Sequence, residues 1–167
     1  LVRELPIPIP GDGTQLVSLT NSKDVASLLA SPLNNPQAAI EQRYFNCGTD
    51  QLVSYDQVAK LCAQTAGIRN YNIEHYDGDL LGKANFPFRL TNFYVAPDVA
   101  KAKLGWTGAQ HSLADDLKAY YENYQARGGP TKKMSLVKDW EVVVGHKTSH
   151  PEYMGSIYDK YDPLVIE

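Results

Sequence analysis

Aromatic and basic residues alternate between positions 83 and 94, in the pattern of a surface that binds single-stranded nucleic acid. The residues are Lys83, Phe86, Phe88, Arg89, Phe93 and Tyr94. Flat rings stack on unpaired bases, and ammonium or guanidinium groups neutralise phosphates. The alternative is that these rings belong to an ordinary core, since aromatic residues also suit half-buried strands. Both interpretations stay open at this stage.

The histidines and paired aspartates have the chemistry of metal ligands but not the expected spacing. The histidines are His75, His111, His146 and His150, and the pairs are Asp77/Asp79 and Asp115/Asp116. His146 and His150 lie four residues apart, yet Pro151 and its loop-like surroundings disfavour a helix there. One aspartate pair flanks a glycine turn, and the other suits the first turn of a helix. We therefore expect structural or solvent-facing roles and no metal centre.

Composition limits the classes of protein to which the chain can belong. The 167 residues carry a formal net charge of −3, which argues against a wholly basic nucleic-acid-binding surface, so any RNA contact must be local. No apolar run reaches the roughly 18 residues of a membrane span, so we expect no membrane insertion. Cys47 and Cys62 are too few for a disulfide framework and favour reduced thiols in the core.

In the first half of the chain, the pattern predicts alternating strands and helices. Strands are expected at 16–20 and 43–46, and Asp24 is expected to open a helix that ends before Pro32. Residues 34–36 are expected to form a loop. The clearest signal is Ser54 with Gln57 three residues later, a capping box that starts a helix ending at Gly67. That register places Val58, Leu61, Cys62 and Thr65 on one side.

In the second half, a strand is predicted at 71–76 and an aromatic strand after Arg89. Pro97 suits the first turn of a helix over 98–104 that Gly105 ends. Ser112 should cap a further helix, with one side lined by Leu113, Leu117, Tyr120, Tyr121 and Tyr124. The glycines at 128 and 129 end it. We expect one unit over 1–128, followed by an extended arm over 129–167 whose tyrosines, glycines and prolines follow no helical period.

Three segments resemble the extended short-chain dehydrogenase/reductases, the NAD-dependent epimerase/dehydratase family. PIPIPGDGTQ within residues 1–15 resembles the loop that opens their substrate-binding half, and YFNCG at 44–48 resembles their Y-N-x-G strand end. Residues 85–106, ending in Leu-Gly-Trp, resemble their closing segment. Within the family, FPFR at 86–89, FY at 93–94 and the helix around Lys60 are most similar to chloroplast stem-loop-binding proteins, members associated with RNA.

The resemblance implies an α/β fold, the C-terminal substrate-side portion of an extended Rossmann-type reductase, and a location in the chloroplast. The Gly-rich turn that holds a dinucleotide in this family does not occur in the chain, so NAD(P) would bind only through a preceding half. The family's Tyr-x-x-x-Lys pair is not formed by Tyr55 and Lys60 or by Tyr120 and Lys118. We expect a C-terminal fragment, assign no catalytic residue, and leave open whether the whole protein is an enzyme.

Sugar-nucleotide enzymes of the family use two arginines to clamp a diphosphate, because a guanidinium matches it bidentately. Val17 occupies the position of the first arginine, and Arg89 corresponds to the second. Loss of one charge-assisted bond would weaken diphosphate binding by about 1.5–3 kcal/mol. Arg89 could instead form a surface or interdomain salt bridge.

Three hypotheses follow. The first is a plastid RNA-binding protein of this family, with endoribonuclease activity and a role in RNA stability or ribosome association implied by the resemblance. Its binding residues would be Arg89, Lys83, Asn46, Phe88 and Phe93. The second is an NAD-dependent sugar-nucleotide epimerase or dehydratase, with Arg89 and Asn46 near the substrate. The third is a structural subunit of a homo-oligomer, hetero-oligomer or larger assembly, which docks through residues 131–167.

Overall fold

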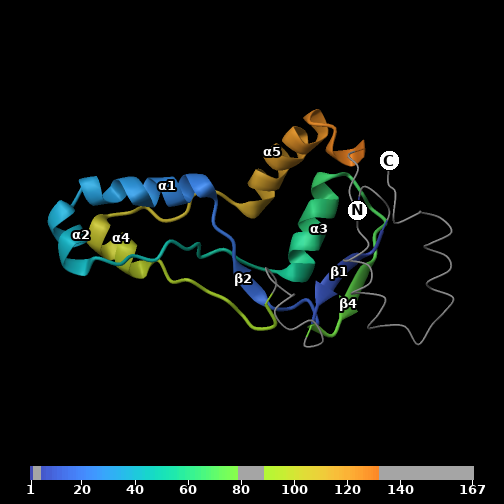
Figure 1. Cartoon of the computed structure of the whole chain (residues 1–167), viewed down its shortest axis with the longest axis horizontal. Coiled ribbons are helices and arrows are strands. Elements are labelled where there is room, and N and C mark those ends of the chain that lie inside the picture. The colour runs from blue at the N-terminus through green and yellow to red at the C-terminus, as the bar shows by residue number, and fades with distance from the viewer. Residues whose placement is uncertain (2–4, 79–88, 132–167) are drawn as a thin grey trace.

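The computed structural model describes residues 1, 5–78 and 89–131. Two groups of elements lie at opposite ends of an elongated arrangement (Figure 1). Strands β1 (Ile7–Pro10) and β4 (Ile73–Tyr76) lie at one end with helices α3 (Tyr55–Thr65) and α5 (Leu113–Ala126). Helices α1 (Ser22–Ala30), α2 (Pro36–Gln42) and α4 (Asp98–Leu104) lie at the other, with β2 (Leu16–Ser18) and β3 (Leu52–Ser54) between them. The mixed α/β fold confirms the predicted class.

The strands form two separate two-stranded sheets. β1 pairs with β4 in parallel, and β2 pairs with β3 in antiparallel orientation. The backbone N–H groups of Ile7 and Gly11 donate to carbonyls of the β4 segment, at Asn72 and Tyr76. Because N–H groups alternate between the two edges of a strand, Pro8 and Pro10 occupy positions that face away from β4. Proline is therefore tolerated inside β1.

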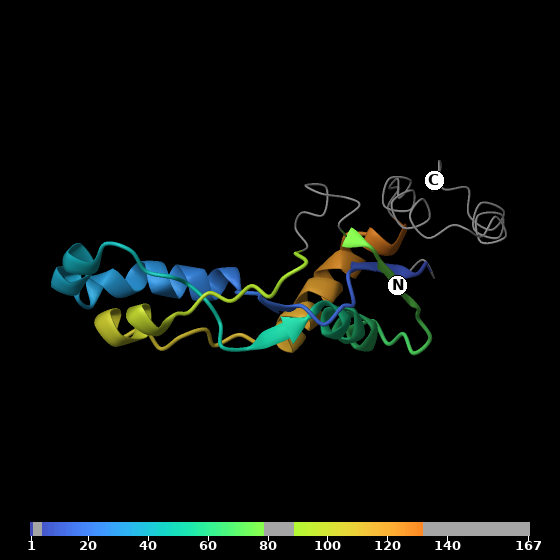
Figure 2. The same ribbon diagram turned by 90° about the horizontal axis from the view of Figure 1, so that it is seen from below.

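The buried apolar residues form two clusters, one in each group of elements. Ile9, Val17, Val53, Tyr55 and Ala59 form the cluster between the sheets and α3. Leu28, Ala100, Leu104 and Trp106 form the cluster between α1 and α4, which lie side by side in both views (Figure 2). The connecting segments pass so closely that Gly48 has no room for a Cβ atom against the carbonyl of Val95. The core is thus divided along the length of the molecule.

Three of the predicted helices begin and end at their expected signals. Ser54 accepts the backbone N–H of Gln57 at the start of α3, and Ser112 accepts that of Asp115 at the start of α5. Gly105 ends α4 with a positive φ of 65°, the conformation glycine adopts at least cost. The helix predicted from Asp24 is α1, although its cap is Asn21, whose side chain accepts the N–H of Lys23.

Two sequence predictions for local structure are wrong, and a third is right only in part. The loop predicted at residues 34–36 is shorter than expected, because Asn35 caps α2 and Pro36 occupies the first position of that helix. Residues 43–46 are not a strand: Arg43 has a φ of 65° at the end of α2, and the residues after it have no ladder partner in the described part of the chain. The expected aromatic strand is reduced to one bridge, between Val17 and Phe93.

Helix α5 has the predicted one-sided row of leucine and tyrosine side chains. Leu113, Leu117 and Tyr121 of that row are half-buried, and none of the residues of the helix is fully buried. Tyr121 and Tyr124 stack on each other with ring centroids 6.2 Å apart, and Tyr120 is exposed. The helix contacts α3 through part of that row, and Leu113 packs against the first core cluster. Residues 132–167, most of the predicted arm, lie outside the described residues.

The candidate nucleic-acid interface

Arg89 and Phe93 form the centre of the candidate interface. The guanidinium carbon Cζ of Arg89 lies 4.1 Å from the centroid of the Phe93 ring, within the range of a cation–π contact. Both residues are exposed, Phe93 with 38% of its surface accessible. One face of the ring is therefore covered by a planar cation rather than by core side chains. This pair is the aromatic and basic combination expected from the sequence.

The segment that carries the pair is fixed at both ends. The backbone N–H of Arg89 donates to the phenolic oxygen of Tyr55 at 2.8 Å. At the other end, the N–H of Phe93 donates to the carbonyl of Leu16 at 2.8 Å, and the carbonyl of Phe93 accepts from Ser18 at 3.0 Å. The side chain of Asn92 also accepts the N–H of Leu16 at 2.8 Å. Tyr55 and β2 thus position the interface.

Tyr55 supports the candidate interface, and the sequence did not reveal this contact. It is 8% exposed and belongs to the first core cluster, where its ring packs with Val17 and Val53. Thirty-four residues separate it from Arg89 along the chain. No local pattern could indicate that its hydroxyl reaches the interface, since the contact depends on the tertiary fold.

The remaining predicted site residues are not all brought together. Asn46 is exposed, in the segment between α2 and β3, and no hydrogen bond joins it to Arg89 or Phe93 in the part of the chain that the structure describes. Lys83 and Phe88 lie outside the described residues. Of the predicted binding residues, Arg89 and Phe93 are therefore the two whose association the structure shows.

Tyr94 is directed to a different set of residues. Side chains of consecutive residues in an extended segment point to opposite sides, and the hydroxyl of Tyr94 donates to Asp50 at 3.4 Å. Asp50 also forms an ion pair with Lys101 at 2.5 Å, and that ammonium group holds the pKa of Asp50 below its ordinary value. Lys101 is consequently paired at neutral pH. It adds little free positive charge to the surface around Phe93.

A shallow hollow adjoins Arg89 and is acidic. It is lined by Gly11, Asp12, Thr14, Gln15, Asp77, Gly78, Leu90, Thr91 and Asn92. Hydrogen bonds from the side chain and backbone of Thr14 hold the pKa of Asp12 below its ordinary value, so this carboxylate is ionised at neutral pH. The described residues of the lining include no cation, so a diphosphate would meet the negative charge of Asp12 there. This hollow suits a sugar or a neutral base edge better than a phosphate chain.

Val17 lies at the position where the resemblance places the first clamping arginine. It is 5% exposed, pairs with Val53 of β3, and forms the bridge with Phe93. Its side chain belongs to the first core cluster. The position is therefore part of the hydrophobic core, and no second guanidinium is available there to complete a diphosphate clamp with Arg89.

The described histidines pair with carboxylates. The Nε2 atom of His75 lies 2.9 Å from Asp56, over the turn at Gly13, and both side chains are more than a third exposed. The Nδ1 atom of His111 lies 2.8 Å from Asp24, which is 2% exposed. Burial alone would raise the pKa of Asp24, but hydrogen bonds from the backbone of Gln110 and from His111 outweigh it and lower the pKa. These pairs join elements distant in sequence.

Cys47 and Cys62 are free thiols, as the sequence predicts. Burial raises the pKa of both above the ordinary value, so neither is an activated thiolate at neutral pH.

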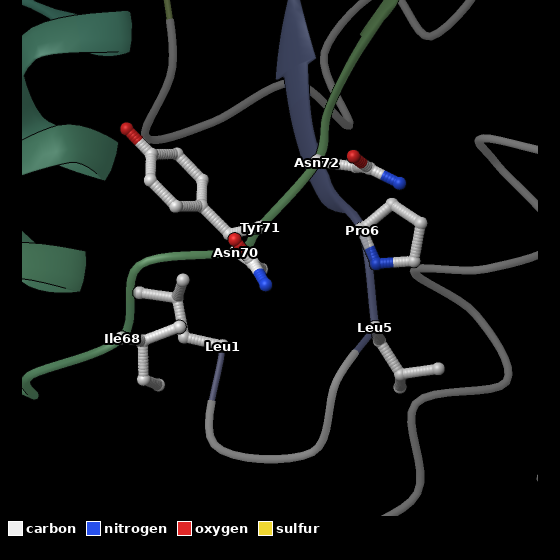
Figure 3. Close-up of a pocket in the computed structure, with 7 residues that line it drawn as sticks. All are labelled: Leu1, Leu5, Pro6, Ile68, Asn70, Tyr71 and Asn72. Carbon is white, nitrogen blue, oxygen red and sulfur yellow. The ribbon is translucent and has the colours of Figure 1, made fainter.

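A second pocket lies where the chain enters β1 beside the turn before β4 (Figure 3). It is lined by Leu1, Leu5, Pro6, Ile68, Asn70, Tyr71 and Asn72. Arg89, Phe93 and Asn46 do not line it, and the side chains of its described lining are apolar, aromatic or amide groups without charge. It therefore does not extend the Arg89–Phe93 surface.

Among the described helices, the longest is α5 with 14 residues, and none has the length and apolar character that crossing a membrane requires.

Comparison with known proteins gives one sequence relative and several structural ones. The chain is 33% identical over 137 residues to the chloroplast stem-loop binding protein of 41 kDa b, a chloroplastic protein of Arabidopsis thaliana. The alignment covers 80% of this chain, and the chain spans about a third, 35%, of that relative's length. The relative's location agrees with the expectation from the resemblance. No family model matches the chain.

The solved structures that resemble the chain are sugar-nucleotide epimerases. UDP-glucuronic acid 4-epimerase from Bacillus cereus, in complex with UDP-glucuronic acid and NAD, has a TM-score of 0.55 and 19% identity, with 75% of this chain and 37% of that one covered. UDP-glucose 4-epimerase from Thermotoga maritima has a TM-score of 0.53 and 20% identity, with the same coverage. At such identities the likeness establishes the fold. The chain is therefore a relative of the chloroplast stem-loop binding proteins and has the fold of the C-terminal part of an extended short-chain dehydrogenase/reductase.

Proposed function

We propose that the chain is the C-terminal portion of a plastid RNA-binding protein and that the surface around Arg89 and Phe93 contacts the RNA. The observation that carries this proposal is the guanidinium of Arg89 lying over the exposed ring of Phe93. Planar cations and aromatic rings are the groups that proteins use to hold unpaired nucleotides. The relative's name, a stem-loop binding protein, supports the same ligand class.

The alternative, a sugar-nucleotide epimerase or dehydratase, has the fold of the structural relatives in its favour. Two observations disfavour it in this portion of the chain. Val17 is buried where the first arginine of a diphosphate clamp would lie, and the described lining of the hollow beside Arg89 holds Asp12 and Asp77 but no cation. A diphosphate would lose a charge-assisted bond and gain repulsion.

Endoribonuclease activity and a role in RNA stability or ribosome association enter the proposal through the family resemblance alone. No described residue is assigned a catalytic role. The division into a unit over 1–128 and an arm over 129–167, which would dock on a homo- or hetero-oligomeric partner, is likewise part of the proposal. NAD(P) would be held by a half of the protein that precedes these residues.

Removal of two cations tests the RNA proposal. Each phosphate that a protein neutralises contributes about 0.7–0.9 to the slope of log affinity against log salt concentration. In the full-length protein, Arg89→Ala combined with Lys83→Ala should weaken RNA binding and reduce that slope by about two of these increments. Lys103→Ala combined with Arg127→Ala removes the same charge from exposed helix termini and serves as the control.

Equal slopes for the Arg89/Lys83 variant and the parent would remove both residues from the interface. Titration of the same proteins with a UDP-sugar separates the alternative. Measurable affinity in the parent that disappears in the Arg89/Lys83 variant would favour the sugar-nucleotide enzyme instead.

A further inference from the structure

We propose that the Arg89 guanidinium, supported by the Phe93 ring, is a preformed platform on which one unpaired base stacks, so that the ligand is RNA with unpaired nucleotides rather than continuous duplex. The inference rests on the proposed RNA-binding function and specifies its ligand class. The guanidinium carbon Cζ lies over the Phe93 ring, 4.1 Å from its centroid. Arg89 is exposed, so a base can reach the guanidinium from the side away from the ring.

The platform is held before any ligand arrives. Tyr55, which is itself buried, fixes the backbone of Arg89 through its hydroxyl group at 2.8 Å. Two backbone hydrogen bonds to β2 fix the backbone of Phe93, the residue that carries the ring. Ordering a flexible side chain at an interface costs about 0.5–1.5 kcal/mol, and a surface ordered beforehand avoids much of that loss. This arrangement therefore favours a specific contact over a loose electrostatic one.

The geometry favours a base over the groups that a duplex presents. A guanidinium has a flat face that stacks on π systems and an edge of N–H groups that bonds phosphate oxygens. In a duplex the bases stack on one another and offer no free face, whereas loops, bulges and single strands do. The acidic hollow next to Leu90, with Asp12 and Asp77, disfavours a second phosphate track along this side. A single strand that places one base on Arg89 satisfies both constraints.

The platform accepts one base rather than a row. Tyr94, the neighbouring aromatic residue, extends to the opposite side of the segment and donates to Asp50. The ammonium group of Lys101 forms an ion pair with the same carboxylate, that of Asp50. The described aromatic residues next to Arg89 therefore supply one stacking position on this side.

The experiment compares three RNAs with the full-length protein by fluorescence anisotropy at several salt concentrations. The probes are a hairpin with an unpaired loop, the same stem as a continuous duplex of equal length, and an unstructured single strand. Arg89→Lys keeps the charge and removes the plane, and Arg43→Lys, at an exposed arginine after α2, is the matched control. Stacking on one platform changes affinity by about tenfold, within the measured range for a single base.

The parent should bind the hairpin and the single strand about tenfold more tightly than the duplex. Arg89→Lys should lose that preference and leave both the duplex affinity and the salt slope unchanged, while Arg43→Lys behaves as the parent. Equal binding of all three RNAs by the parent, or an undiminished preference in Arg89→Lys, would overturn the stacking platform while the RNA-binding function stands. No binding of any of the three RNAs would overturn that function and the platform with it. Urea denaturation of each variant establishes that the fold is intact.

Discussion

The phenolic oxygen of Tyr55 accepts the backbone N–H of Arg89 at 2.8 Å, so a core residue of α3 holds the central residue of the proposed interface. Tyr55→Phe keeps the ring in its cluster and removes this bond. We expect a loss of about 0.5–1.5 kcal/mol in the free energy of unfolding, the net value of one neutral hydrogen bond. Urea denaturation measures it, with Tyr120→Phe on the exposed side of α5 as the control. A variant as stable as the parent would show that the bond contributes nothing.

Gly13 and Gly67 form a matched pair for backbone strain. Both have positive φ, 75° and 70°, so alanine at either position should cost about 1–2 kcal/mol from the left-handed conformation alone. At Gly67 an added Cβ meets no atom within 4 Å, whereas at Gly13 it overlaps the carboxylate of Asp56 and contacts His75. Gly13→Ala should therefore be the more destabilising by thermal and urea denaturation. Equal losses would mean that the Asp56–His75 pair moves aside without cost.

Asp24 should contribute to stability in a pH-dependent way. Its folded-state pKa lies below the ordinary value of 3.8, so the contribution is present above that pH and is lost as the pH falls through the folded-state pKa. Asp24→Asn removes the charge that accepts N–H groups from Gln110 and His111, and should cost about 1–3 kcal/mol at pH 7.

The difference between Asp24→Asn and the parent should then shrink as the pH falls below 3.8, because the unfolded chain binds the proton first and the folded carboxylate binds it only at a lower pH. Glu122→Gln, at an exposed position of α5, should show neither effect. Unfolding free energies at pH 7, 5 and 3 measure both variants. A constant difference over this range would contradict a stabilising carboxylate.

Val17→Arg restores the residue type that sugar-nucleotide enzymes use but places it in the core. We expect a loss of about 3–5 kcal/mol, because the side chain is buried and meets no carboxylate partner in its cluster. Leu16→Arg, the exposed neighbour in β2, should cost within about 1 kcal/mol. A stable Val17→Arg protein that gains UDP-sugar affinity would instead show that the position opens toward a ligand.

The sequence predicts the structure best where the signal is local. Ser54, Gly105 and Ser112 mark helix ends that the structure confirms, because a cap depends on groups within four residues. Asn35–Pro36 is the same kind of signal, an N-cap followed by proline at the first helical position, but the composition Asn-Asn-Pro is equally typical of a turn. The helix it starts has no buried residue, so no apolar period indicates it.

The sequence predicts the residue types of the candidate site and the one contact that is local. Arg89 and Phe93 lie four residues apart in the predicted aromatic and basic pattern, and the structure brings them together. The long-range hydrogen bonds do not follow from a local pattern. Leu16 bonds Asn92 across 76 residues, and Asp24 bonds His111 across 87. Such contacts arise when distant elements share a core. A single sequence, taken by itself, does not show which distant residues are in contact.

The prolines of β1 determine how the sheet of β1 and β4 can associate. At Pro8 and Pro10 the edge of β1 that faces away from β4 has no backbone N–H donor. An approaching strand could donate to the carbonyls of this edge, but its own carbonyls would find no donor at these positions. Sheets with an unpaired edge are open to intermolecular pairing, and proline is one of the residues that prevents it. The alternation of isoleucine and proline therefore allows pairing with β4 while protecting the opposite edge against aggregation.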